Sequence, residues 1–341
     1  MTPYISFVVA ARNDNYGDDF NYRLENSINQ LANLIEQYKL PSEYIIVNYN
    51  PLLDKAPLIE QIKWPKSTYC KIRIITVSPE IHQTLSDENI RVNVPLYEYI
   101  AKNIGIRRAK GEFVCSANPD LMFSPQIIKY ISKRKLKKES YYRANRVDFN
   151  RIEINSQNLP KTLIRDLQKN VFRVFLLGNT INIYLKKNFY IQFNLLKLLN
   201  RIYQPIRQFY REVIFHNEKI PEHYYNCNCS GDFMLLHKKK WFKLKGNPEY
   251  TKAAVHTDSM FVIMAAMSGL KEKVFYWPIY HQNHDRRYEC DSDNSDLIID
   301  EMYETYVKMG RQMIKQGAPI IQNNNDWGLA DYKLEEDYIF I

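Results

Sequence analysis

The stretch Ile5-Ser6-Phe7-Val8-Val9-Ala10-Ala11-Arg12-Asn13-Asp14 decides the fold class. Its first half is a short, continuous apolar run with β-branched residues, which is typical of a buried strand. A polar stretch follows as far as Asp19, and apolar residues then recur at helical spacing: Leu24, Ile28, Leu31, Leu34 and Ile35. The sequence therefore predicts a strand, a loop and a helix.

The same alternation continues through the first half of the chain. Further strands are expected at Tyr44–Val47, Ile72–Val77 and Glu112–Cys115, and a further helix from about Leu96 to Lys110. Pro125 opens another helix, since proline is tolerated in the first helical turn. Strands that alternate with helices indicate a mostly parallel sheet with helices on both faces. We therefore expect an α/β, Rossmann-like fold.

The composition is that of an ordinary globular protein. The chain has 341 residues, of which 45% are hydrophobic and 25% charged, and this excludes collagen, low-complexity and disulfide-rich miniprotein classes. Its five cysteines include no C-x-x-C pair, which argues against a structural zinc site and indicates a reducing compartment. We find neither a signal peptide nor an apolar run approaching the roughly 20 residues of a membrane span. We expect a cytoplasmic protein, soluble or peripherally associated with a membrane.

An excess of basic residues gives the chain a formal net charge of +9. Such a charge favours anionic partners, among them nucleotides, phosphorylated sugars, nucleic acids and acidic membrane surfaces, without choosing between them. Residues 151–223 are rich in basic and apolar residues, with Phe193, Leu196, Leu199 and Ile202 near helical spacing. This region predicts a basic, largely helical insert, which either packs its apolar stripe on the sheet or touches a membrane or acceptor.

Polar clusters follow three of the predicted strands: Arg12-Asn13-Asp14, Asn48-Tyr49-Asn50 and Ser116-Ala117-Asn118-Pro119-Asp120. In open α/β sheets, ligands bind in the crevice outside the carboxyl ends of the strands, so we expect a binding site there. Neither G-x-G-x-x-G nor G-x-x-x-x-G-K-[ST] occurs. Their absence argues against a dinucleotide-binding Rossmann enzyme and a P-loop NTPase.

An ordered set of motifs resembles GT-A glycosyltransferases, particularly the family 2-like group. In the first half it comprises Phe7–Asp14, Ala101-Lys102-Asn103-Ile104-Gly105-Ile106-Arg107-Arg108-Ala109-Lys110-Gly111-Glu112-Phe113 and Asn118-Pro119-Asp120. Later landmarks are Ser230-Gly231-Asp232-Phe233, His256-Thr257-Asp258 and Asp326–Asp331. The resemblance leaves out the insert. It implies that residues 1–150 form the nucleotide-sugar-binding half of one GT-A domain and residues 224–341 its acceptor-binding and catalytic half.

The resemblance implies transfer of a sugar from a nucleoside-diphosphate sugar, with a UDP-sugar favoured, to an acceptor hydroxyl in glycan biosynthesis. A departing diphosphate needs charge neutralisation, usually by Mn²⁺ or Mg²⁺. Asp120 is the first candidate ligand, and His284, with His281 nearby, is the second. Asn118 stands where the family pattern D-x-D has its first aspartate, which weakens the expected metal dependence. The literal Asp291-Ser292-Asp293 follows no predicted strand and is interpreted as a decoy.

The resemblance also suggests the catalytic base. Asp258 lies in a His-Thr-Asp string before an apolar helix, where its carboxylate is either the base of an inverting single displacement or a helix cap. Asp232 is the second candidate, with a role in donor or acceptor contact, and its alternative is a turn aspartate.

For the nucleotide, Ala10, Arg12 and Asn13 are expected to border the base. Asn48 stands where many family members carry an acidic residue, and its amide can still read the imide edge of a base by donating and accepting hydrogen bonds. Asn103 and Arg107 lie four residues apart and share one helix face, which either reaches the nucleotide or phosphate or is exposed to solvent.

Three other functions stay open at the level of sequence. The basic surface and abundant tyrosines are compatible with a nucleic-acid-binding protein, but no recognition motif organises them, and no nucleic-acid partner is expected. A sugar nucleotidyltransferase would need a glycine-rich phosphate loop that is missing here. A non-catalytic relative that binds nucleotide sugars is kept open by Asn118.

Overall fold

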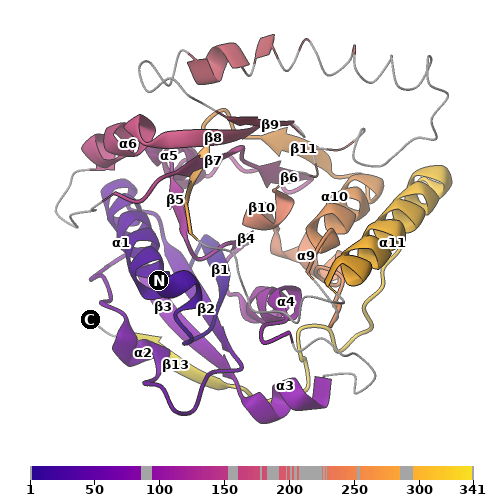
Figure 1. The fold of residues 1–341 in the computed structure, drawn as a ribbon, viewed down its shortest axis with the longest axis horizontal. Coiled ribbons are helices and arrows are strands. Elements are labelled where there is room, and N and C mark those ends of the chain that lie inside the picture. Colours follow the sequence, from indigo (N-terminus) through magenta and orange to yellow (C-terminus); the bar gives the residue numbers. More distant parts are fainter. Residues whose placement is uncertain are drawn as a thin grey trace.

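The computed structural model describes residues 2–85, 94–152, 160–176, 179–182, 192–196, 198–199, 229–251, 254–284 and 295–339, together with 202, 206, 225 and 227. Its centre is a set of four parallel strands, in the order β4-β1-β2-β3. They are β1 (Ile5–Ala11), β2 (Ser42–Tyr49), β3 (Cys70–Val77) and β4 (Phe113–Ala117). The four strands expected from the sequence are confirmed, and Figure 1 shows them at the middle of the molecule.

Four further strands complete this eight-stranded sheet, and they make it mixed rather than purely parallel. Beyond β4 lie β10, antiparallel to it, then β6 and β11; beyond β3 lies β13, also antiparallel. Their bounds are β6 Ser140–Arg143, β10 Phe233–His237, β11 Lys271–Val274 and β13 Glu335–Ile339. The sheet therefore combines segments from both ends of the chain.

Helices cover both faces of the sheet (Figure 1). On β1, Phe7 and Val9 join a core with α1 and α5, while Val8 and Ala10 join one with α4, α9, α10 and α11. This alternation follows from the two-residue period of a strand buried on both faces. The helices are α1 (Phe20–Tyr38), α2 (Leu58–Gln61), α3 (Pro79–Leu85), α4 (Glu98–Arg108), α5 (Pro125–Ser132), α9 (Lys238–Leu244), α10 (Thr257–Met267) and α11 (Ser295–Gln316), with 3-10 turns η1 (Tyr16–Asp18) and η3 (Ser230–Asp232).

The close packing of α4 on the sheet depends on Gly105. A Cβ atom there would lie 2.4 Å from Val8 Cγ1 and 3.2 Å from Val47 Cγ2, and such contacts force a backbone shift in a close-packed interior. The glycine of the N-x-G-I string therefore sets the distance between α4 and the carboxyl-terminal half of the central strands.

A second sheet of five strands was not predicted from the sequence. Its order is β5 (Leu121–Phe123), β12 (Ile279–Gln282), β7 (Arg146–Phe149), β8 (Val171–Leu176) and β9 (Asn179–Asn182). The region expected to be a largely helical insert begins with α6 (Pro160–Lys169), but β8 and β9 then extend this sheet. The described residues of 192–206 are helical, as expected. No helix among the described residues combines the length and the apolarity that crossing a membrane requires.

Candidate metal and donor site

The candidate site forms where the two sheets meet, at the carboxyl end of β4. Asp120 occupies the tight connection between β4 and β5, and β5 pairs antiparallel with β12 so that His281 lies opposite Leu121. The backbone N–H of Asn283 then donates to Phe149 O, and this turn brings His284 back towards Asp120. One short strand pairing thus joins residues from the two halves of the sequence.

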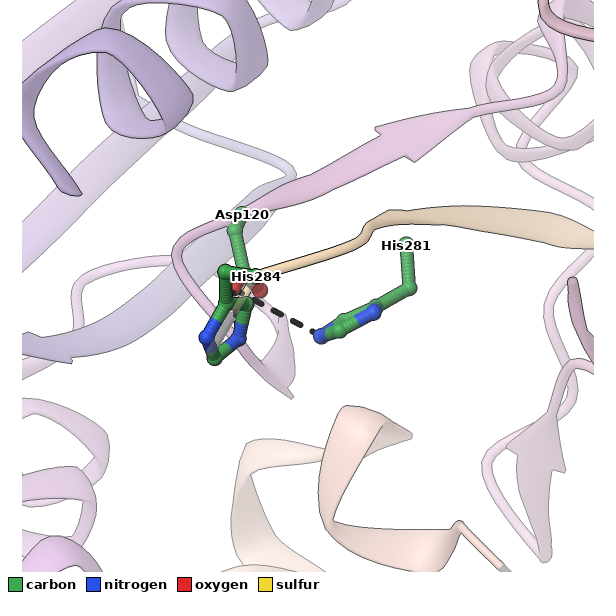
Figure 2. A group of neighbouring side chains, drawn as sticks. All are labelled: Asp120, His281 and His284. Carbon is green, nitrogen blue, oxygen red and sulfur yellow. Dashed lines mark ion pairs between the residues drawn. The ribbon is translucent and has the colours of Figure 1, made fainter. Parts of the chain in front are cut away.

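Asp120, His281 and His284 converge on one point (Figure 2). Asp120 Oδ2 lies 3.2 Å from His284 Nε2 and 3.5 Å from His281 Nε2. One ligand atom from each residue lies within 4.8 Å of the other two. Asp120 and His281 are buried and His284 is half-buried. A carboxylate oxygen and two imidazole nitrogens in this arrangement can hold a divalent cation.

The electrostatics of Asp120 favour its charged form. Burial alone would raise the pKa of Asp120, but His281, His284 and Arg23 outweigh it and hold the pKa well below its usual range. Arg23 Nε lies 3.6 Å from the same Oδ2. Asp120 is only 5% exposed, and within the described chain its other oxygen, Oδ1, has no hydrogen-bond partner. A buried carboxylate oxygen without a donor is costly, and a bound cation would satisfy it.

A second layer of charged residues supports His281 from behind. Asp148 is fully buried, and its Oδ1 lies 3.4 Å from His281 Nδ1. The same carboxylate accepts hydrogen bonds from Arg146 Nε at 2.6 Å and Arg173 Nε at 2.7 Å. Arg146 Nη2 also lies 3.0 Å from His281 Nδ1. A carboxylate behind a ligating imidazole fixes the orientation of the ring, as in many metal sites.

A cleft of about 500 Å³ opens beside the cluster. Its walls carry Ala10, Arg12, Asn118, Asp120 and His284 from the sequence prediction, and also Asp14, Tyr16, Arg23, Glu98, Lys102, Arg146, Val255 and His281. The structure therefore brings Ala10, Arg12, Asn118, Asp120 and His284 together around one cavity. Four of the walls' side chains are arginine or lysine and three are aspartate or glutamate, so the walls carry a small excess of positive charge, which suits an anionic ligand.

Lys102 is a cleft residue that the sequence reasoning missed. Its side chain is buried, and Nζ donates to Glu98 Oε1 at 2.5 Å, Asn118 Oδ1 at 2.7 Å and Gly231 O at 2.9 Å. Because the Asn118 amide oxygen accepts from Lys102, it faces an ammonium group rather than the cluster. The only signal for Lys102 in the sequence was its place in the string around Asn103.

Asp232 and Asp258 lie behind this wall. Asp232 accepts from Asn118 Nδ2 at 2.7 Å and pairs with Arg146 at 3.1 Å. Asp258 Oδ2 accepts from Ser230 Oγ at 2.7 Å and from the Gly231 backbone N–H at 2.6 Å. The Gly231 carbonyl in turn accepts from Lys102. Asp258 is therefore linked through Gly231 to Lys102, which lines the wall.

Two donor-site predictions at the strand ends need correction. The Asn13 side chain is 1% exposed and holds the loop after β2, where it donates to Leu52 O and Ala56 O and accepts from Leu52 N–H. Its hydrogen bonds are used within the protein, and it does not line the cleft. Asn48 is 5% exposed at the end of β2, and its Oδ1 has no hydrogen-bond partner in the described chain, but it does not line the cleft.

The prediction for Asn103 and Arg107 is also corrected. Asn103 is fully buried, and it bonds Asn247 and Glu249 rather than any group of the cleft. Arg107 donates to Trp327 O at 2.9 Å and lies over the Trp327 ring. The shared helix face was predicted correctly, but it faces the carboxyl-terminal segment. Gly328 N–H donates to Glu249 as well, so Glu249 joins α4 to that segment.

Replacing Glu249 with glutamine is expected to remove a pH-dependent loss of stability. Burial raises the pKa of Glu249 to about 6; hydrogen bonds from Asn103 and Gly328 oppose this, and Asp326 adds to it. A carboxyl whose pKa is higher in the folded state than in the unfolded state stabilises the fold most when the pH is below its unfolded pKa, here near 4.5. This contribution to the free energy of unfolding is lost as the pH rises through 6. The loss corresponds to about 2 kcal/mol.

Urea unfolding of both proteins checks this result. At pH 4.5 the wild type and Glu249→Gln are expected to have similar free energies of unfolding, whereas above pH 6 the variant is the more stable. The same substitution at exposed Glu335 is the control and shows no such divergence. If the free energies of unfolding of the wild type and Glu249→Gln differed by the same amount at both pH values, the pH dependence would not come from Glu249.

A larger cavity, of about 630 Å³, lies at the opposite end of the sheet, near the amino ends of β2 and β3. Two of its charged residues, Arg73 and Glu43, pair with each other at 2.9 Å, and Arg73 also contacts Glu336 at 2.9 Å. The clustered Asp120, His281 and His284 lie in the smaller cleft. The predicted decoy Asp291-Ser292-Asp293 falls outside the described residues.

Comparison with known proteins gives a likeness of structure only. No protein-family profile and no curated protein matches the sequence. Among solved structures, the chain is similar to GalNAc-T7 with UDP, GalNAc and Mn²⁺, with a TM-score of 0.50 and 11% sequence identity. The likeness covers 90% of this chain and 48% of that one, so the chain spans about half the length of the structure it matches. The chain has the GT-A fold.

This result confirms the α/β, GT-A fold expected from the ordered motifs. In the GT-A architecture described here, the Asp120, His281 and His284 cluster lies beyond the carboxyl ends of the parallel strands, where α/β sheets bind ligands. The matched structure contains a nucleotide and a divalent cation.

Proposed function

We propose that this protein is a glycosyltransferase of the family 2-like type, which transfers a sugar from a nucleoside-diphosphate sugar to an acceptor hydroxyl. A UDP-sugar is the favoured donor. The observation that carries the proposal is the Asp120, His281 and His284 cluster at the floor of a basic cleft in a GT-A fold. Residues 1–150 then supply most of the donor wall, and residues 224–341 supply the two histidines and the base.

The three clustered residues fit a divalent cation. Two imidazole nitrogens and one carboxylate favour Mn²⁺ over Mg²⁺, because Mg²⁺ prefers oxygen ligands. The unpartnered Asp120 Oδ1 supports the same assignment. When bound, the ion neutralises the charge that develops on the departing diphosphate. Asn118 is not among the proposed ligands, since its amide oxygen is held by Lys102.

Arg12 is proposed to bind the donor diphosphate directly, and the other basic residues of the cleft to add positive charge around it. Arg12 is fixed by Asn50 O at 2.6 Å and Asp14 at 3.1 Å, so its guanidinium is oriented before the donor arrives. Lys102 and Arg146 are likewise held by carboxylates and carbonyls of the wall. Side chains positioned in advance stabilise developing charge without reorganising. Ala10 lines the wall at the end of β1, where the nucleotide base is proposed to lie.

Asp258 is proposed as the general base of an inverting single displacement. Its carboxylate accepts the proton of the acceptor hydroxyl, while the hydroxyl oxygen bonds to the anomeric carbon and the bond from that carbon to the diphosphate breaks. The hydrogen bonds from Ser230 and Gly231 orient the carboxylate. Asp232 is paired with Arg146 and Asn118, so it is assigned to positioning the wall rather than to proton transfer.

Thermal shift with a panel of UDP-, GDP- and dTDP-sugars, with and without Mn²⁺, tests the proposal. One donor at about a hundredfold excess over its dissociation constant is expected to stabilise the native state by about 2.7 kcal/mol, and only when Mn²⁺ is present. Release of the nucleoside diphosphate in the presence of acceptors then distinguishes an enzyme from a non-catalytic nucleotide-sugar-binding relative. No shift across the panel would reject nucleotide-sugar binding, and a shift independent of Mn²⁺ would reject the metal site.

A further inference from the structure

An exposed apolar stripe lies far from the cleft, in the basic region between β9 and η3. Five large aliphatic side chains there are each between 52% and 59% exposed: Leu195, Leu198, Leu199, Ile202 and Ile206. The described residues of this segment are helical. Figure 1 shows the segment beyond β8 and β9, at the upper edge of the view. Water-exposed leucine and isoleucine in such a contiguous set mark an interaction surface.

The segment is apolar on two opposite sides. Phe193 is 1% exposed and, with Leu196, packs against the core of the second sheet. Helical positions advance by about 100° per residue, so Leu195 lies about 200° around the helix from Phe193. Leu198 and Leu199 follow Leu195 at three and four residues, which is the spacing of one helix side. The side that carries Phe193 and Leu196 therefore packs against the rest of the protein, and the stripe faces away from the protein.

The charged residues of this region indicate which kind of partner would bind the stripe. From Ile183 to Arg211 the sequence contains no aspartate or glutamate, and all its charged residues are basic: Lys186, Lys187, Lys197, Arg201, Arg207 and Arg211. Tyrosine and phenylalanine are interspersed among them, at Tyr184, Phe189, Tyr190, Tyr203, Phe209 and Tyr210. An apolar helix face with basic and aromatic neighbours is typical of segments that lie in the interface of an anionic bilayer. A second copy of this chain would instead bring like charges together.

We propose that the stripe of Leu195, Leu198, Leu199, Ile202 and Ile206 docks this protein on anionic membrane surfaces, with the aliphatic side chains inserted among the lipids and the basic residues at the headgroups. This docking does not depend on the proposed transferase activity. It requires neither the metal cluster nor a donor.

Co-sedimentation of the full chain with lipid vesicles tests the proposal. The wild type is expected to bind vesicles of phosphatidylcholine with about one third phosphatidylserine at least about tenfold more tightly than pure phosphatidylcholine vesicles. Raising the salt concentration from about 0.1 M to about 0.5 M weakens this binding. The double variant Leu198→Gln/Ile202→Gln is expected to bind anionic vesicles at least about tenfold less tightly, because both aliphatic insertions are lost.

Leu53→Gln is the matched control, since Leu53 is 79% exposed outside the segment, and this variant binds vesicles like the wild type. Melting temperatures of all three proteins are expected to agree, because the substituted side chains are exposed. Vesicle binding that the double substitution leaves unchanged, or no preference for anionic lipid, would overturn the proposal. So would a wild-type dimer that the double variant dissociates, because the stripe would then be a self-association surface.

Discussion

Asp120→Asn is expected to reduce both Mn²⁺ binding and sugar transfer strongly. The change preserves side-chain size but removes the only carboxylate of the Asp120, His281 and His284 cluster. A metal contributes several kcal/mol of charge stabilisation, and each 1.36 kcal/mol is a factor of ten in rate. The expected fall in turnover is therefore roughly a thousandfold.

Isothermal titration with Mn²⁺ separates this effect from general damage to the cleft. Asp14→Asn is the matched control, because Asp14 lines the same cleft and pairs with Arg12 at 3.1 Å, but it is not one of the clustered residues. The control is expected to keep wild-type Mn²⁺ affinity, and the melting temperature of Asp120→Asn without metal reports whether it folds. Unchanged Mn²⁺ affinity in Asp120→Asn would show that the cluster is not the metal site.

Asp258→Asn is expected to lower the turnover number by roughly 10²- to 10⁴-fold, the range of general-base contributions. The amide keeps an oxygen that can accept from Ser230 or Gly231, but it cannot take a proton from the acceptor. Donor and Mn²⁺ affinities are expected to stay at wild-type values, because neither ligand is proposed to contact Asp258.

Ser230→Ala distinguishes a base from a residue that only organises the η3 turn. It removes the hydrogen bond to Asp258 Oδ2 while leaving the carboxylate and the Gly231 contact in place. If Asp258 is the base, this variant loses less than about tenfold in turnover. Equal losses in both variants would assign Asp258 to the turn, and near wild-type turnover in Asp258→Asn would remove it from the mechanism.

The central fold was predictable because its signals are local. The apolar runs of β1 to β4 and the helical spacing of α1 each lie within one short window of sequence. The second sheet was missed because its strands are only three to six residues long, and because β12 pairs with β5 and β7 across a large sequence separation. A three-residue strand such as Leu121–Phe123 carries no periodicity of its own.

The candidate site was predicted in part for the same reason. Asp120 was found from its place after a strand, and the resemblance added His284, but no local pattern indicates that β12 returns to β5. Lys102, Arg146 and Asp148 were missed because a buried charge and a solvated one look alike in a sequence. Asn103 was misplaced because spacing gives the helix face but not the element against which it packs.

The pairing of β5 with β12 also has a consequence for biosynthesis. Gln282 Nε2 donates to Asp120 O across 162 residues of sequence. During translation the central strands β1 to β4 leave the ribosome first, whereas both histidines emerge much later. The nascent amino-terminal half therefore carries Asp120 without its two imidazole neighbours. The proposed metal site is therefore complete only after His284 has been synthesised.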